Sequence, residues 1–267
     1  FETVLTGDKS LSKRPMKRIS DPLSKMNARI LTTDGTLPIV IKGSNLISCN
    51  LDLHIPSAQI KSGILLAALN TKGETKIIEN KVTRDHTEIM LKSFDANIKI
   101  SKTVDKKIIK IVGQKELTNR NIDVPNDLSS SAFFIVSALI NKNSNITLRN
   151  INNNPTRNGL LLALKKMGAN ISFHNVRKSN SENICDIKVT TSKLIGCELG
   201  SEIADLMIDE YPILAVAAAF AEGTTIMLGL KELRVKESDR LSAISKGLIA
   251  CGVKVEETID SLTVYGK

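Results

Sequence analysis

A short run near the end of the chain gathers acidic and basic side chains. The run is Leu233-Arg234-Val235-Lys236-Glu237-Ser238-Asp239-Arg240-Leu241, and six of its nine residues are polar or charged. A lysine and a glutamate beside an arginine at a helix start can hold an anion next to a proton donor. A solvated helix N-terminus has the same composition, so these residues alone leave both interpretations open.

Three other places combine polar side chains with a predicted helix start. Asp209 precedes the apolar stretch Glu210–Glu222, where its carboxylate either caps a helix or acts as a base toward a substrate hydroxyl. A second place is Thr83-Arg84-Asp85-His86, which forms either a helix cap with a surface ion pair or a phosphate-binding site. Ser57-Ala58-Gln59 and Ser129-Ser130-Ser131 offer hydroxyls and free backbone amides, which suit phosphate or a polyol but also ordinary capping.

The elements that must position these residues recur four times along the chain. Each copy ends a helical pattern at a residue type that tolerates the left-handed backbone conformation, and a β-branched residue follows. These four stop residues are Asn27, Asp95, Gly168 and Gly252. An arginine lies 11 to 13 residues before each stop, at Arg14, Arg84, Arg157 and Arg240. Nearby hydroxyls are expected to cap the four helices, at Ser12, Thr83, Thr156 and Ser238.

The repeated arginines suggest an anion-binding surface. Helix starts attract anions through their free amides and the helix dipole, so several starts that face one way would collect negative charge. Each arginine alone is explained as well by solvation of a helix end. Recurrence in four units favours the anion-binding interpretation.

Further helices and strands complete an α/β pattern of many strands and short helices. Helices are predicted at Ser57–Leu69, at 127–140 with Asp127 as N-cap, and at Glu210–Glu222 up to Gly223. Strands are predicted at Thr75–Ile78, Ile108–Val112, Ile146–Leu148, Ile187–Thr190, Thr225–Leu228 and Leu262–Tyr265. Residues 178–182 are predicted to be an exposed loop, and residues 123–126 are expected to form a hinge.

The composition narrows the class of protein. The chain has 267 residues, 42% hydrophobic residues, a formal net charge of +9, 3% aromatic residues and no Trp. Scarce aromatic side chains and dispersed basic charge argue against nucleic-acid binding. Four cysteines and three histidines show no metal-ligand spacing, so no metal is expected, and the cysteines are expected to be reduced. No apolar run reaches membrane-spanning length.

Six segments resemble the EPSP synthase (5-enolpyruvylshikimate-3-phosphate synthase) family, in the family's order and from end to end of the chain. They are Ser10–Met16, Pro56–Ser62, Thr83–Glu88, Asn154–Arg157, Ile208–Pro212 and Leu233–Arg240. The resemblance implies an enolpyruvyl transferase-like, inside-out α/β barrel of repeated βαββαβ units, with buried helices and outer sheets. It also implies two domains, residues 1–124 and 125–267, with helix N-termini that converge on a cleft.

The resemblance further implies transfer of the enolpyruvyl group of phosphoenolpyruvate to the 5-hydroxyl of shikimate 3-phosphate. The implied shikimate 3-phosphate residues are Ser57, Ala58, Gln59, Arg84, Asp209 and Lys236, and the implied phosphoenolpyruvate residues are Arg14, Gln59 and Arg240. Asp209 is the implied base and Glu237 the implied proton shuttle. No cofactor is implied, and the full-length protein is expected to be a cytoplasmic monomer that binds no nucleic acid or membrane.

Departures from the family pattern and the rival classes bear on this assignment. Asn126, Asn27 and Asp95 stand where the family usually has glycine. The family's N-terminal and C-terminal segments are missing, so we expect a piece of a longer protein with little turnover by itself.

The related UDP-N-acetylglucosamine enolpyruvyl transferases carry a reactive cysteine where this chain has Lys9. A non-catalytic anion- or RNA-binding protein built on the same repeats is the alternative from another class.

Overall fold

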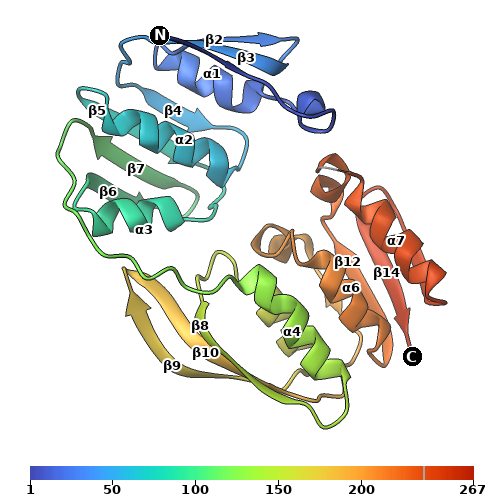
Figure 1. Cartoon of the computed structure of the whole chain (residues 1–267). Coiled ribbons are helices and arrows are strands. Elements are labelled where there is room, and N and C mark those ends of the chain that lie inside the picture. The colour runs from blue at the N-terminus through green and yellow to red at the C-terminus, as the bar shows by residue number, and fades with distance from the viewer. Residues whose placement is uncertain (237) are drawn as a thin grey trace. The chain divides into compact units, whose positions relative to one another are not determined.

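A computed structural model describes residues 1–236 and 238–267 (Figure 1). The chain divides into two compact units, Phe1–Ile122 (unit 1) and Asp123–Lys267 (unit 2), and each is described by itself. The boundary predicted from the sequence lies two residues later, between residues 124 and 125. Among the described residues, none of the helices has both the length and the apolar character needed to cross a membrane.

Unit 1 holds two sheets and the helices that connect their strands. The first part comprises β1 (Glu2–Leu5), the 3₁₀ helix η1 (Leu11–Lys13), α1 (Lys17–Lys25), β2 (Arg29–Thr33) and β3 (Thr36–Lys42). The second part comprises β4 (Asn50–Leu53), α2 (Ala58–Leu69), β5 (Glu74–Glu79), α3 (His86–Ser93), β6 (Asn97–Lys102) and β7 (Lys107–Val112). The sheet orders are β1-β3-β2 and β4-β5-β7-β6.

The second part of unit 1 is one complete repeat. β4 and β5 are parallel, and β5 and β6 both run antiparallel to β7. Parallel strands need a crossover, which α2 and α3 supply, whereas β6 and β7 form a simple hairpin. The element order is therefore βαβαββ, and the predicted order βαββαβ is wrong about the place of the second helix. The first part repeats the later half of this pattern, from β1 through α1 to the β2–β3 hairpin.

Unit 2 contains two further repeats. The first comprises α4 (Leu128–Ile140), β8 (Asn145–Asn152), α5 (Gly159–Lys166), β9 (Ile171–Ser179) and β10 (Glu182–Thr190). The second comprises β11 (Glu198–Leu199), η2 (Ser201–Leu206), α6 (Tyr211–Ala219), β12 (Gly223–Leu228), η3 (Lys231–Val235), α7 (Arg240–Ala250), β13 (Lys254–Glu257) and β14 (Ser261–Gly266). The sheet orders are β8-β10-β9 and β11-β12-β14-β13, and a bridge from Asn126 to Ile151 adds a short parallel partner to β8. Both repeats follow the order seen in unit 1.

The four predicted helix stops are confirmed. The φ angles are 67° at Asn27, 59° at Asp95, 86° at Gly168 and 79° at Gly252. Each residue turns the chain out of a helix and into the first strand of the hairpin that ends its repeat. Asn and Asp do this because their short polar side chains tolerate the left-handed region.

The predicted caps are partly correct. Ser57 and Asp127 are the N-caps of α2 and α4, and their side chains accept hydrogen bonds from the backbone amides of Ile60 and Ser130. The four hydroxyl caps are wrong, since the N-caps of α1, α3, α5 and α7 are Met16, Asp85, Asn158 and Asp239. Three of those hydroxyls have other partners: Ser12 donates to the Gly7 carbonyl, Thr83 to Glu79 and Thr156 to Asn154.

The remaining predicted helices and strands are also found, with two corrections. The helix predicted up to Gly223 ends as α6 at Ala219, and Gly223 begins β12. All six predicted strands lie within β5, β7, β8, β10, β12 and β14. The predicted loop at 178–182 is instead a tight turn at Asn180 and Ser181, both with positive φ, that joins β9 to β10. Each unit has its own apolar core, which includes Ile64 and Ile77 in unit 1. These cores hold the helices in place and so determine where their starts lie.

Candidate functional site

The start of α2 carries three of the predicted substrate residues in unit 1. Ser57 is in the β region and accepts a hydrogen bond from the Ile60 amide at 3.4 Å, which marks the helix start. Ala58 and Gln59 occupy the first turn, and Gln59 is exposed. Amides in a first helical turn point away from the helix and are able to bind an anion.

The two predicted arginines of unit 1 stand just before helices. Arg84 lies two residues before His86, where α3 begins, and is half-buried. Arg14 is half-buried too and lies between η1 and α1, with its backbone amide bonded to the Leu11 carbonyl at 3.1 Å. Both arginines are therefore located at helix starts, as the repeat predicts.

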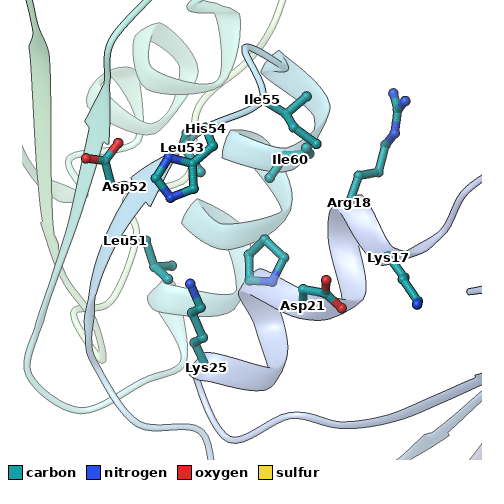
Figure 2. A pocket seen from close by; sticks show the side chains of 11 residues that line it. Lys17, Arg18, Asp21, Lys25, Leu51, Asp52, Leu53, His54, Ile55 and Ile60 are labelled. Carbon is teal, nitrogen blue, oxygen red and sulfur yellow. The ribbon is translucent and has the colours of Figure 1, made fainter.

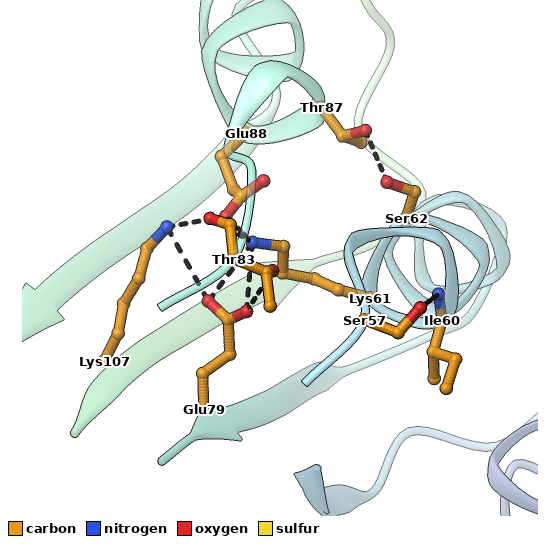
Figure 3. Close-up of polar contacts among 9 residues, drawn as sticks. All are labelled: Ser57, Ile60, Lys61, Ser62, Glu79, Thr83, Thr87, Glu88 and Lys107. Carbon is orange, nitrogen blue, oxygen red and sulfur yellow. Dashed lines mark hydrogen bonds and ion pairs between the residues drawn. The ribbon is translucent and has the colours of Figure 1, made fainter. Parts of the chain in front are cut away.

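A buried group of four charges, here called the buried quartet, lies between α2, α3 and the sheet of unit 1 (Figure 3). It consists of Lys61 on α2, Glu79 on β5, Glu88 on α3 and Lys107 on β7, each with a side chain at most 2% exposed. Lys61 Nζ lies 2.8 Å from Glu88 and 3.1 Å from Glu79. Lys107 Nζ lies 2.8 Å from Glu88 and 3.7 Å from Glu79. The two positive and two negative charges compensate one another.

The quartet also contacts the segment that carries Arg84. The Thr83 hydroxyl donates to Glu79 Oε1 at 2.5 Å, and Lys61 Nζ lies 3.5 Å from the Thr83 carbonyl oxygen. The hydroxyls of Ser62 and Thr87 lie 2.6 Å apart and join α2 to α3 (Figure 3). Sequence reasoning missed this arrangement, although Lys61 lies on the same helical face as the apolar residues three and four positions later.

Unit 1 also has a cavity of about 260 Å³. It is lined by α1, by β4, by the segment that follows β4 and by Ile60 of α2 (Figure 2). Lys17, Arg18 and Lys25 place cations along it, Asp21 and Asp52 are its acids, and leucine and isoleucine supply an apolar wall. The described lining contains none of the predicted substrate residues, so the cavity gives those assignments no support.

In unit 2, Arg157 joins the starts of three helices. Its guanidinium lies 3.2 Å from Asp127, the N-cap of α4, and 4.0 Å from Glu210, the N-cap of α6. It also donates to the Ser129 hydroxyl, which itself donates to Glu210. Glu210 is buried, and the Arg157 side chain is 21% exposed. Arg157 is thus engaged with protein acids rather than solvating a helix end.

Asp209 and Arg240, two of the predicted catalytic and substrate residues, are in contact. Arg240 Nη1 lies 3.1 Å from Asp209 Oδ1, and the two side chains are 29% and 35% exposed. Asp209 is not the N-cap of α6, because the neighbouring Glu210 holds that position. The ion pair joins the start of α7 to the segment before α6.

The other two predicted residues of unit 2 lie in the run before α7. Lys236 follows η3 directly and is half-buried. Glu237, the predicted proton shuttle, lies outside the described residues. Asp239 caps α7 by accepting from the Ser242 amide at 2.9 Å and also pairs with Arg234 at 2.8 Å.

Two helix-capping carboxylates in unit 2, those of Asp127 and Asp239, have pKa values lowered from the ordinary value. The backbone hydrogen bond from Ser242, followed by the hydrogen bond and charge of Arg234, lowers the pKa of Asp239. Burial by itself raises the pKa of Asp127, but hydrogen bonds from Ser130 and the charge of Arg157 lower it overall. Both carboxylates are therefore held in the charged form, in which their oxygens accept hydrogen bonds from the helix amides.

Comparison with solved structures identifies the fold of the chain. The enolpyruvyl transferase NikO from Streptomyces tendae matches with a TM-score of 0.70 at 18% identity, over 99% of this chain and 60% of that chain. EPSP synthase from Acinetobacter baumannii matches with a TM-score of 0.86 at 45% identity, over 100% of this chain and 60% of that chain. The fold is therefore that of the enolpyruvyl transferases, an α/β fold of repeated units.

Sequence comparison narrows the class to one family. The model of the family described as EPSP synthase (3-phosphoshikimate 1-carboxyvinyltransferase) matches residues 1–267. The 3-phosphoshikimate 1-carboxyvinyltransferase of Paramagnetospirillum magneticum is 51% identical over the whole chain, and that of Cereibacter sphaeroides is 48% identical over 98% of it. The chain belongs to the EPSP synthase family. It spans about 60% of the length of these relatives.

No group of three or more potential metal-ligating His, Cys, Asp or Glu side chains occurs in the part of the chain that the structure describes.

Proposed function

We propose that the chain is part of an enzyme that transfers the enolpyruvyl group of phosphoenolpyruvate to the 5-hydroxyl of shikimate 3-phosphate and releases phosphate. The observation that carries the proposal is the match of the EPSP synthase family model to all 267 residues. Relatives named 3-phosphoshikimate 1-carboxyvinyltransferase are 48–51% identical to the chain. The cationic helix starts agree with it, because both substrates carry several negative charges.

The residues of unit 1 are proposed to bind shikimate 3-phosphate. Ser57, Ala58 and Gln59 bring a hydroxyl, backbone amides and a side-chain amide to the start of α2. Arg84 brings a guanidinium to the start of α3, where it suits bidentate binding of an oxyanion. Arg14, together with Gln59, is assigned to phosphoenolpyruvate.

The residues of unit 2 are proposed to bind the ring hydroxyls and to move protons. Lys236 and Asp209 are assigned to the ring hydroxyls of shikimate 3-phosphate, and Arg240 is assigned to phosphoenolpyruvate. The Asp209 carboxylate, 3.1 Å from Arg240, accepts the proton of the attacking 5-hydroxyl in this proposal. The ion pair orients the base beside the cation that binds the electrophile.

The proposed reaction passes through a tetrahedral intermediate. Glu237 gives a proton to the methylene carbon of phosphoenolpyruvate, and the adjacent carbon becomes oxocarbenium-like. The 5-hydroxyl oxygen bonds to that carbon while its proton passes to Asp209. The Glu237 carboxylate then takes a proton back from the methyl group as the C–O bond to phosphate breaks, which restores the vinyl group and releases phosphate. Positioning and charge neutralisation supply most of the acceleration.

The setting of this activity is proposed as well. We expect a cytoplasmic protein that is a monomer when full length and binds no nucleic acid. The chain alone is expected to turn over little or not at all. Retention on heparin in about 0.3–0.5 M salt, undisturbed by shikimate 3-phosphate, would favour a nucleic-acid-binding protein instead, since phosphate contacts weaken steeply with salt.

Calorimetric titration of the chain with each substrate tests the proposal. Shikimate 3-phosphate should bind, and Arg84→Ala should weaken binding by about tenfold or more, the loss expected for a charge-assisted contact. Arg240→Ala should weaken the binding of phosphoenolpyruvate, measured in the presence of shikimate 3-phosphate. The binding of shikimate 3-phosphate itself should remain, because Arg84 is intact. Lys110→Met, a change at a lysine on β7 whose side chain is 44% exposed, is the matched control. Equal binding by all four proteins would refute the proposal.

A further inference from the structure

We infer that Thr83, held by the buried quartet, is a positioning residue that fixes Arg84 relative to the start of α2, so that both bind one phosphorylated substrate. The inference rests on the proposed function. It assigns a role to five residues, Thr83 and the quartet, that take no part in the proposed binding and proton transfer.

Thr83 attaches the backbone before α3 to the sheet. Its hydroxyl donates a 2.5 Å hydrogen bond to Glu79 Oε1, at the end of β5, and Thr83 is the residue before Arg84. Lys61 adds a contact of 3.5 Å to the Thr83 carbonyl oxygen. The segment is therefore attached to the sheet at the position next to Arg84.

The acceptor of this hydrogen bond cannot easily move. Both oxygens of Glu79 lie 3.1 Å from Lys61 Nζ, and Oε2 lies 3.7 Å from Lys107 Nζ. The Glu79 side chain is 1% exposed. A carboxylate that is contacted by two buried ammonium groups has one orientation available, so Thr83 is bonded to a rigid point.

The same lysine connects Arg84 to the predicted substrate residues of α2. Lys61 is one helical turn after Ser57, and its backbone amide donates to the Ser57 carbonyl at 3.2 Å. Its ammonium group contacts both Glu79 and the Thr83 carbonyl. A displacement of the α3 start relative to the α2 start would break these buried contacts. The quartet thus sets the spacing between the two helix starts.

The presence of charge in this core supports a positioning role. Apolar side chains of similar volume often stabilise a core as well as buried ion pairs do. Buried ion pairs require a particular geometry, however, whereas apolar packing tolerates small shifts. Four charges from four different elements, α2, β5, α3 and β7, therefore specify the register of those elements.

Two substitutions at Thr83 separate positioning from general packing. Thr83→Val keeps the shape and removes the hydroxyl, and Thr83→Ser keeps the hydroxyl. Calorimetry with shikimate 3-phosphate should show binding about tenfold weaker for Thr83→Val, as for the loss of a charge-assisted contact, and close to that of the parent chain for Thr83→Ser. Should Thr83→Val lose its far-UV circular dichroism spectrum, Thr83→Ala takes its place.

A double-mutant cycle with Arg84→Ala distinguishes a positioning role of Thr83 from a merely structural one. If Thr83 acts through Arg84, the double variant Thr83→Val/Arg84→Ala binds no more weakly than Arg84→Ala alone. The inference is overturned if Thr83→Val binds like the parent chain, or if it weakens binding equally with and without Arg84. Absence of binding by the parent chain would instead contradict the proposed function, so the two failures are distinguishable.

Discussion

Substitution of Lys61 by methionine should destabilise unit 1 strongly. Lys61 Nζ lies 2.8 Å from Glu88 and 3.1 Å from Glu79, and its side chain is 0% exposed. Methionine replaces most of its volume but leaves Lys107 to compensate both carboxylates. One uncompensated buried charge costs about 3–5 kcal/mol of unfolding free energy. With an m-value of about 2 kcal/mol/M, the urea midpoint should fall by roughly 2 M.

The assay is urea denaturation followed by circular dichroism, with amide hydrogen exchange in β5 and β7 to locate the loss in unit 1. The double variant Lys61→Met/Glu88→Gln restores a balanced charge and should recover a large part of the stability. Lys110→Met is the matched control, because that lysine is 44% exposed and pairs with Glu74 at 2.9 Å. It should change stability by less than about 1 kcal/mol. Equal effects of Lys61→Met and Lys110→Met would refute the reasoning.

Three further predictions concern unit 2. Asp239→Ala should cost about 1 kcal/mol through loss of the α7 cap, whereas Asp239→Asn should keep most of it, as thermal melts would show. Ser181→Gly should stabilise the β9–β10 turn by about 1 kcal/mol because φ is 68° there, and Ser181→Ala, the control in the same melts, should bring no gain. Asp127→Asn should destabilise the protein at pH 7, and its deficit against the parent chain should shrink below about pH 4. The sign follows because folding lowers the pKa of Asp127. The charged carboxylate therefore stabilises the fold above its unfolded-state pKa, and this stability is lost as the pH falls. A stability deficit that stays constant in urea melts from pH 3 to 7 would contradict this prediction.

Local features of the fold could be predicted from the sequence, whereas long-range polar contacts could not. Asn27 and Gly168 end helices because their residue types tolerate positive φ, and Asp127 caps α4 through an amide three residues away. Such events depend on a few neighbouring residues. Periodicity likewise predicted the strands, because burial of one face leaves a regular pattern.

The errors arise where a polar side chain finds its partner outside the helix start to which it was assigned. Thr83 was expected to cap a helix but donates to Glu79, four residues earlier at the end of β5. Of the two roles considered for Asp209, the cap of α6 is wrong, since Glu210 holds that position and Asp209 pairs with Arg240, 31 residues away. Which partner a polar group finds depends on how the crossover helices bring strands together, and one sequence does not specify that directly. The order of elements within the repeat was missed for the same reason.

Phosphorus-31 NMR of shikimate 3-phosphate, titrated with the chain and with Arg84→Ala, tests most directly whether cations at helix starts bind the substrate's phosphate. We predict a saturable change in the phosphorus resonance with the parent chain and a much smaller change with Arg84→Ala at the same concentrations. An unchanged resonance with the parent chain, or identical titrations for the two proteins, would contradict the account.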